Sequence, residues 1–188
     1  MTSIEIIRDA IKYVELNNCD WAEFGVSSGK SARMIYELLP EDATLHLFDS
    51  FEGLPENWLD EDGIVFASKG EYKSEPPSWI FNKTNIVVHE GLFKDTIPSF
   101  VKNQKKCLSF INIDCDLYSS TKTIFDNIDE LIVKGTIIHF DEFFNYRCWK
   151  LHEYKAFHEY VDEYNRKYRL LWRADNDYEC QAYVQVIS

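Results

Sequence analysis

The feature that most constrains this chain is an apolar run that ends in two carboxylates one residue apart. Residues 110–113 are almost all apolar, and Asp114 and Asp116 follow them. A continuous apolar run is typical of a strand buried on both faces in a parallel sheet. Ligands of open α/β sheets bind at the carboxyl ends of the strands, so we expect both acids at a ligand-binding edge.

These two acids lie close enough to repel each other if both remain extended and point to one side of the strand. Their coexistence then indicates a bound cation or a shared proton. The alternative is a pair of exposed acids that cap the helix predicted to follow.

A second predicted strand ends in the same way. Residues 135–140 form another buried run, and two adjacent acids come next. Parallel strands carry their carboxyl ends to one edge of a sheet, so we expect four acids to converge there: Asp114, Asp116, Asp141 and Glu142. Clustered oxygen ligands suit a hard divalent cation such as Mg²⁺ and not Zn²⁺.

Composition narrows the class of protein. The 188 residues, 45% of them hydrophobic, are enough for one domain with a substantial core. The net charge of −12 argues against a nucleic-acid or anionic-membrane partner. The five cysteines are scattered and form no CxxC pair, so we expect free thiols in a reduced, cytoplasmic compartment. No apolar run reaches membrane-spanning length, and an acid stands at Glu5, where a signal peptide would carry bases.

Hydrophobic periodicity predicts helices that alternate with strands. Helices are expected near residues 3–17, 31–39, 93–101, 119–132 and 149–164. Strands are expected at residues 21–26, 44–49, 85–89, 110–113, 135–140, 170–173 and 180–186. This order is typical of an α/β domain with a mostly parallel sheet. We expect Gly135 to end the 119–132 helix and the alternating 180–186 segment to be an antiparallel edge strand. No linker or repeat divides the chain, so residues 1–188 are interpreted as a single domain.

A glycine-bearing turn follows the first predicted strand. It begins at Gly25 and leads into a helix N-terminus, which is a common place to hold a nucleotide-like ligand. The dinucleotide fingerprint GxGxxG is absent. Glu23 suits a cationic ligand and would repel a pyrophosphate. Asp49 ends the next strand about 24 residues after Gly25, near the spacing at which a carboxylate binds a ribose hydroxyl. The alternatives are a turn that needs glycine for backbone reasons and a turn-forming aspartate.

Five blocks of sequence occur in an order that matches a known family. They are EFGV at 23–26, FDSFEGLP at 48–55, GLFKDTIP at 91–98, DCDLYSST at 114–121 and GTIIHFDE at 135–142. With these blocks the chain resembles the class I S-adenosylmethionine-dependent methyltransferases. Within that class it resembles the macrocin-type sugar O-methyltransferases. The resemblance spans about residues 20–160, and FDSFEGLP is its most specific part.

The resemblance implies a fold and a cofactor. The fold is a Rossmann-like, seven-stranded, mostly parallel sheet with an antiparallel C-terminal strand and helices on both faces. The cofactor is S-adenosylmethionine, with its methionine end at Glu23 and Gly25, its ribose at Asp49 and its adenine near Gly91. The residues we expect to contact it are Glu23, Gly25, Ser28, Gly29, Ser31, Asp49, Ser50, Phe51, Gly91, Phe93 and Asp114.

The resemblance also assigns the chemistry. Asp114, Asp141 and Glu142 would bind a divalent ion, expected to be Mg²⁺, and Asp116 would be the general base. The family usually has two aspartates where this chain has Asp141 and Glu142. His152 is a second candidate base. The expected reaction is metal-assisted O-methylation of a hydroxyl on a sugar, a glycosylated metabolite or another small molecule.

Two other functions fit parts of the pattern. Asp114 and Asp116 form a DxD sequence, which also marks metal-dependent glycosyltransferases, but Glu23 and the second acidic pair would repel a nucleotide diphosphate. A non-catalytic cofactor-binding module is the other alternative, and the intact acids argue against it. The chain is short for this family, so a homo-oligomer whose second copy completes the pocket stays open.

Residues 50–84 form a long connection between predicted strands. Connections of this length inside a domain are often functional, and we hypothesise a lid that closes over the cofactor. Its aromatic residues Trp58, Phe66 and Tyr72 are candidates to cover a substrate, whereas Trp79 and Phe81 are expected to pack a short helix onto the core. His139 is interpreted as a core histidine with a satisfied hydrogen bond.

Overall fold

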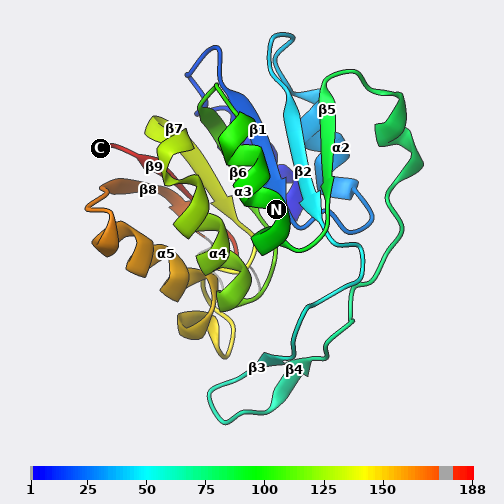
Figure 1. Cartoon of the computed structure of the whole chain (residues 1–188). Coiled ribbons are helices and arrows are strands. Elements are labelled where there is room, and N and C mark those ends of the chain that lie inside the picture. The colour runs from blue at the N-terminus through cyan, green and yellow to red at the C-terminus, as the bar shows by residue number, and fades with distance from the viewer. Residues whose placement is uncertain (1, 174–179) are drawn as a thin grey trace.

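Seven strands form one sheet in the order β5-β2-β1-β6-β7-β9-β8 (Figure 1). The computed structural model describes residues 2–173 and 180–188. The first five strands of that order are parallel, and β9 runs antiparallel to both β7 and β8. The bounds are β1 Asp20–Phe24, β2 Leu45–Asp49, β5 Ile86–Glu90, β6 Leu108–Ile113, β7 Ile132–Phe140, β8 Tyr168–Arg173 and β9 Ala182–Val186. The predicted Rossmann-like fold is confirmed.

Helices cover both faces of this sheet. Their bounds are α1 Ser3–Ile11, α2 Lys30–Glu37, α3 Phe93–Asn103, α4 Tyr118–Ile128 and α5 Glu153–Glu163. One apolar cluster joins α1 and α2 to alternate residues of the central strands, Trp21 and Phe110 among them. The opposite cluster joins α3, α4 and α5 to the residues between these, such as Ala22 and Ile111. Both faces of β6 are therefore buried, which explains its continuous apolar sequence. In the part of the chain that the structure describes, no helix has the length and apolar character needed to cross a membrane.

Two predictions about helix ends are wrong. Helix α1 ends at Ile11 and not near residue 17. Helix α4 ends at Ile128 and a 3₁₀ helix, Asp129–Leu131, continues it close to the predicted end, but Gly135 does not end it: it lies inside β7 with a φ of +100°. The pairing of β6 with β7 shifts between Ile132 and Ile137, so extra residues of β7 bulge there. A Cβ on Gly135 would lie 3.2 Å from Leu16, so glycine permits this bulge instead of ending the helix.

The prediction that the last strand lies at the sheet edge is also wrong. Strand β9 lies between β7 and β8, and β8 is the edge strand. Residues of β9 are therefore mostly buried, although Gln185 gives the segment an alternating look. Alternation of polar and apolar side chains along a strand indicates which of its faces is buried, and it does not indicate whether another strand pairs with its edge.

The long connection contains a small separate hairpin. Strand β3, Trp58–Leu59, pairs with β4, Val65–Ala67, and this pair projects away from the main sheet (Figure 1). A short 3₁₀ helix, Ser78–Asn82, follows. Trp79 packs on Tyr36 as predicted, but Phe81 is 67% exposed and Ile80 is the buried residue. Movement of this connection as a lid stays a prediction.

A disulfide joins Cys19 to Cys107, contrary to the prediction of free thiols for all five cysteines. Cys19 precedes β1 and Cys107 precedes β6, and these strands are parallel neighbours. Their pairing sets Asp20 opposite Leu108, so the two cysteines lie together although 88 residues separate them in sequence. The sequence argument for a reduced compartment therefore loses its support.

Candidate functional site

A cavity of about 800 Å³ opens at the carboxyl ends of the parallel strands. Its lining includes Gly25 after β1, Ser50 after β2, Gly91 after β5, Asp116 after β6 and Glu142 after β7. Strand β1 lies between β2 and β6, where the order of the sheet reverses. This reversal is the place at which open α/β sheets bind ligands.

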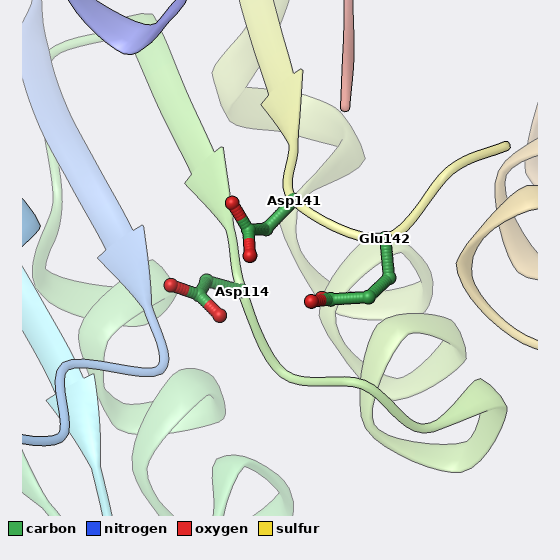
Figure 2. A group of neighbouring side chains, drawn as sticks. All are labelled: Asp114, Asp141 and Glu142. Carbon is green, nitrogen blue, oxygen red and sulfur yellow. The ribbon is translucent and has the colours of Figure 1, made fainter. Parts of the chain in front are cut away.

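The ends of β6 and β7 bring three carboxylates together (Figure 2); Asp114 and Glu142 line the cavity, and Asp141 lies beside them outside the lining. One oxygen each from Asp114, Asp141 and Glu142 can be chosen so that all three lie within 4.8 Å of one another. The backbone explains this: Asp114 N–H donates to Phe24 C=O at 2.9 Å, and Asp141 N–H donates to Ile113 C=O at 3.0 Å. The strands therefore end level with one another, as the sequence predicts.

The electrostatics of these three carboxylates favour a bound cation. Burial raises the pKa of both Asp114 and Glu142 well above the usual range, and the neighbouring charge of Asp141 raises both further. Oε2 of Glu142 is buried and has no hydrogen-bond partner among the described residues. Gln181 donates one hydrogen bond to Asp141 Oδ1 at 3.0 Å. Buried like charges with few donors are stabilised by a metal ion or by protons.

Asp116 occupies a strained turn beside these acids. Its φ is +63°, and Leu117 N–H donates to Cys115 C=O at 2.6 Å across it. It is therefore not part of the extended strand, which ends at Ile113. Burial, followed by the charges of Asp141 and Glu71, raises the pKa of Asp116 to about 7. A carboxyl group with such a pKa can accept a proton at neutral pH.

The alternative that the paired acids cap helix α4 is wrong. The N-cap residue is Leu117, and no side chain forms a capping hydrogen bond there. Instead, Ser119 and Ser120 of the first turn line the cavity.

Glu153 is a fifth carboxylate of the site, which the sequence places near the approach of the substrate but without a role of its own. It begins α5 and is fully buried. Its carboxylate accepts long hydrogen bonds from Cys115 N–H at 3.4 Å and Glu142 N–H at 3.3 Å. It therefore links the two segments that carry the acids. An acid in the first turn of a helix is ordinarily explained by the helix dipole, so no sequence signal separates Glu153 from a surface residue.

At the other end of the cavity, Asp49 holds the turns that follow β1 and β2. One carboxylate oxygen, Oδ2, accepts hydrogen bonds from Val26 N–H at 2.7 Å and Ser27 N–H at 2.8 Å. The other, Oδ1, accepts one from Phe51 N–H at 2.8 Å. Asp49 also lines the cavity, so a ribose contact stays a prediction beside this structural role.

Glu23 lies beneath the first turn and does not line the cavity, so the predicted direct contact with a cofactor is not supported. It is fully buried, and Asn112 Nδ2 donates to its Oε1 at 2.9 Å. Burial raises the pKa of Glu23 to about 8, although hydrogen bonds from Ser31 and Asn112 oppose the rise. His139 Nδ1 contacts Asn112 Oδ1 at 2.6 Å, which agrees with its interpretation as a core histidine.

Part of the predicted cofactor turn is covered by protein. Gly29 is the N-cap of α2, and a Cβ there would lie 2.5 Å from Pro77 of the long connection. Phe51 is only 4% exposed and belongs to the core. Five of the eleven predicted residues are absent from the lining, namely Glu23, Ser28, Gly29, Ser31 and Phe51, whereas six line it: Gly25, Asp49, Ser50, Gly91, Phe93 and Asp114.

Gly25 has a backbone reason to be glycine. Its φ is +90°, and a Cβ there would lie 1.7 Å from the carbonyl oxygen of Asp114. The turn after β1 and the segment after β6 thus approach more closely than any side chain allows. The close approach is also what sets the first turn beside the acidic rim.

His152 does not reach the cavity. It stands at the break between the 3₁₀ turn Trp149–Leu151 and α5, which directs it toward the hairpin. Its Nε2 contacts Leu59 C=O at 2.9 Å, and it is absent from the lining residues. The prediction of His152 as a base is therefore not supported, because its Nε2 contacts the backbone of β3 at Leu59.

Aromatic residues that the sequence offers as a cover for the substrate make up another part of the lining. Trp58, Phe66 and Tyr72 from the long connection line the cavity together with Tyr146. The ring of Trp58 meets Phe66 at 4.8 Å and Tyr146 at 5.8 Å, centroid to centroid. These residues come together only because the connection folds back over the strand ends.

Known proteins resemble this chain in sequence and in fold. A family model described as a methyltransferase domain matches residues 22–143. The calicheamicin methyltransferase CalS11 superposes with a TM-score of 0.77 at 21% identity, over 98% of this chain and 79% of that one. The O-methyltransferase NovP gives 0.72 at 23% identity, with the same 98% and 79% coverage.

A more distant structure is an O-methyltransferase from Bacillus cereus in complex with SAH. It gives a TM-score of 0.61 at 14% identity, over 100% of this chain and 81% of that one. No curated protein matches the chain significantly in sequence. At these identities the structural likeness establishes the fold, and it does not single out the macrocin-type group.

Proposed function

The chain belongs to the family of methyltransferase domains, and on that premise we propose that it transfers a methyl group from S-adenosylmethionine to a hydroxyl of a small molecule, with a divalent cation at the acidic rim. The observation that carries this proposal is the single cavity that reaches from the turn after β1 to the carboxylates after β6 and β7. A methyl donor and a hydroxyl oriented by acids fit the two ends of such a cavity.

The residues at the rim fit a divalent ion. Asp114, Asp141 and Glu142 offer oxygen ligands, and Glu142 Oε2 is a buried atom that lacks a partner among the described residues. Hard cations such as Mg²⁺ prefer oxygen ligands of this kind. An ion held there would lower the pKa of the acceptor hydroxyl and fix its direction. The extra methylene of Glu142 is compatible with this role, because its carboxylate reaches the other two.

The residues beside the rim supply the remaining steps. Asp116 would accept the proton of the acceptor hydroxyl while that oxygen attacks the methyl carbon. The new C–O bond would form as the C–S bond breaks and S-adenosylhomocysteine leaves. Its raised pKa suits this task near neutral pH. Glu153 keeps the two acid-bearing segments at a constant spacing. Phe93 and Leu92 give the donor end an apolar wall. Alignment of the reacting atoms is the main contribution that such a site makes.

The similar structures support transfer to oxygen. CalS11 is described as a TDP-rhamnose 3'-O-methyltransferase and NovP as an O-methyltransferase. A sugar or glycosylated metabolite is therefore the acceptor we propose for this chain. The glycosyltransferase alternative loses support, because the matching family is one of methyltransferases.

A thermal-shift experiment tests the proposal. S-adenosylhomocysteine at about a hundredfold over its dissociation constant adds about 2.7 kcal/mol of stability. That corresponds to a rise in Tm of about 2–4 °C per kcal/mol for a chain of this size. Mg²⁺ should add a further rise that a chelator reverses, and NAD⁺ serves as the negative control. Absence of any shift with S-adenosylhomocysteine at millimolar concentration would contradict cofactor binding.

A further inference from the structure

The acceptor end of the cavity combines aromatic rings with carboxylates. From this combination we propose that the acceptor carries a protonated amino group in addition to the hydroxyl that receives the methyl group. The inference rests on the proposed methyl transfer and adds the chemical class of the acceptor.

Aromatic rings form one wall of this end. Trp58 is buried and meets Phe66 and Tyr146 edge to face. Phe66 is 56% exposed and Tyr72 52% exposed, yet both line the cavity. Large rings left open over a cavity are surfaces that a ligand covers.

Carboxylates lie in the same part of the lining as the rings. Glu56 lines the cavity and accepts a hydrogen bond from the Ser119 hydroxyl at 2.6 Å, so its charge is held in place. Asp116 lines the same cavity as Tyr72 and Tyr146, so acids and rings border one space.

No cation balances these acids at this end among the described lining residues. Lys94 is the one basic residue of the described lining, and it follows Phe93 at the β5 end. Nearby cations are paired elsewhere: Arg147 contacts Asp60 and Asp62, and Lys73 contacts Glu52. A divalent ion bound by Asp114, Asp141 and Glu142 would still leave Glu56 without an ion pair among the described residues.

This arrangement selects by charge. The faces of aromatic rings attract cations, and the attraction strengthens when the site excludes water. A phosphate or carboxylate on the acceptor would meet like charges in the same space. An amino sugar or another hydroxylated amine fits both the rings and the carboxylates, whereas a nucleotide diphosphate sugar fits neither.

Two matched sets of probes test the inference. The first is glucosamine, glucose and glucose 6-phosphate, and the second is dopamine, 4-methylcatechol and 3,4-dihydroxyphenylacetate. The full chain with Mg²⁺ and S-adenosylmethionine is assayed for methyl transfer, and with S-adenosylhomocysteine for binding. We expect the amine to exceed the neutral probe by about fivefold or more in at least one set, and the anion to rank last.

Three outcomes overturn the inference: a neutral probe that equals the amine, an anion that exceeds it, or no binding by any probe. A thermal shift with S-adenosylhomocysteine alone in the same samples distinguishes failure of the amine preference from failure of the proposed methyl transfer. Stabilisation there with the wrong charge order rejects only the amine, whereas no stabilisation rejects the methyl transfer itself.

A charge-neutral variant gives a second measurement. Glu56→Gln keeps an acceptor for the Ser119 hydroxyl and removes the charge, so the preference for amine over neutral probe should fall about two- to fivefold. Phe66→Leu removes an exposed ring and should reduce the same preference by a similar factor. Glu52→Gln is the matched control, because Glu52 pairs with Lys73 and does not line the cavity. An unchanged preference in both Glu56→Gln and Phe66→Leu overturns the inference.

Discussion

Both ends of the cavity carry acids at the ends of parallel strands, but the two groups of acids differ in the number of hydrogen-bond donors that contact them. At the β1 and β2 end, Asp49 accepts three backbone hydrogen bonds. At the β6 and β7 end, Asp114 and Glu142 are buried beside each other, and Glu142 Oε2 has no partner among the described residues.

This difference distinguishes carboxylates whose partners are protein donors from carboxylates that have few protein partners and can bind a ligand. A carboxylate supplied with N–H donors is already stabilised in its charged form. A group of partly buried carboxylates with few donors is stabilised by a cation or by protons. Acids at strand ends thus look alike in sequence and differ in which partners the fold brings to them.

The largest expected effect comes from removing one acid of the rim. Asp114→Asn should lower kcat at least about a hundredfold, because the charge stabilisation that a metal gives is worth several kcal/mol. The Tm of the metal-free variant should not fall, since the change relieves like-charge repulsion. Steady-state kinetics and thermal melts with and without Mg²⁺ measure both.

Asp95→Asn is the matched control for that change. Asp95 is an exposed acid in the first turn of α3 and does not line the cavity. Full activity of Asp114→Asn, independent of Mg²⁺, would show that the rim is not a metal site.

The next effect distinguishes the role of Asp49. Asp49→Ala removes the acceptor for three backbone N–H groups and should lower the free energy of unfolding by about 2–4 kcal/mol. Chemical denaturation measures this, and affinity for S-adenosylhomocysteine should fall in parallel. If affinity falls while stability stays the same, Asp49 acts as a ligand contact and not as the residue that holds the two turns.

Stability should also depend on pH in the metal-free protein. The raised pKa values of Glu23, about 8, and Asp116, about 7, mean that the folded protein keeps protons that the unfolded chain has lost. Their stabilisation is present at low pH and is lost as pH rises toward 8. His89 and His139 have pKa values lowered to about 4, so their opposite contribution is complete near pH 6.5. We therefore expect Tm in a chelator to fall between pH 6.5 and 8.5.

The Glu23→Gln variant sharpens this test. It should flatten part of the pH dependence and leave the response to Mg²⁺ intact, because Glu23 lies outside the three-acid group. A Tm that rises from pH 6.5 to 8.5 would count against neutral carboxyl groups in the folded protein.

The smallest effect is expected at His152. His152→Gln should leave kcat within about tenfold, because His152 anchors Leu59 and does not line the cavity. Loss of a general base costs about 10²–10⁴-fold, and we expect a loss of that size for Asp116→Asn. Comparison of the two variants in one assay decides which residue accepts the proton.

Local patterns in the sequence were sufficient to predict the two strands that carry the acids of the site. The apolar runs of β6 and β7, each followed at once by acids, predicted two buried parallel strands and the meeting of Asp114 with Asp141 and Glu142. A strand's burial and the level at which it ends are properties of neighbouring residues, so they can be read from the chain itself.

Contacts between distant segments could not be predicted in the same way. The buried position of Glu153, the anchoring of His152 to Leu59 and the rings of Trp58 and Phe66 depend on how residues 50–84 and α5 fold against the strand ends. The pairing of Cys19 with Cys107 depends on the register of two strands far apart in sequence.

The sequence by itself therefore determined the sheet, its order of helices and strands, and the edge at which the acids gather. Only the tertiary structure decided which acids are saturated by backbone donors and which stand open to a ligand. The physical reason is that strand formation follows local periodicity, whereas the state of a carboxylate follows whatever donors the folded chain brings within hydrogen-bond distance.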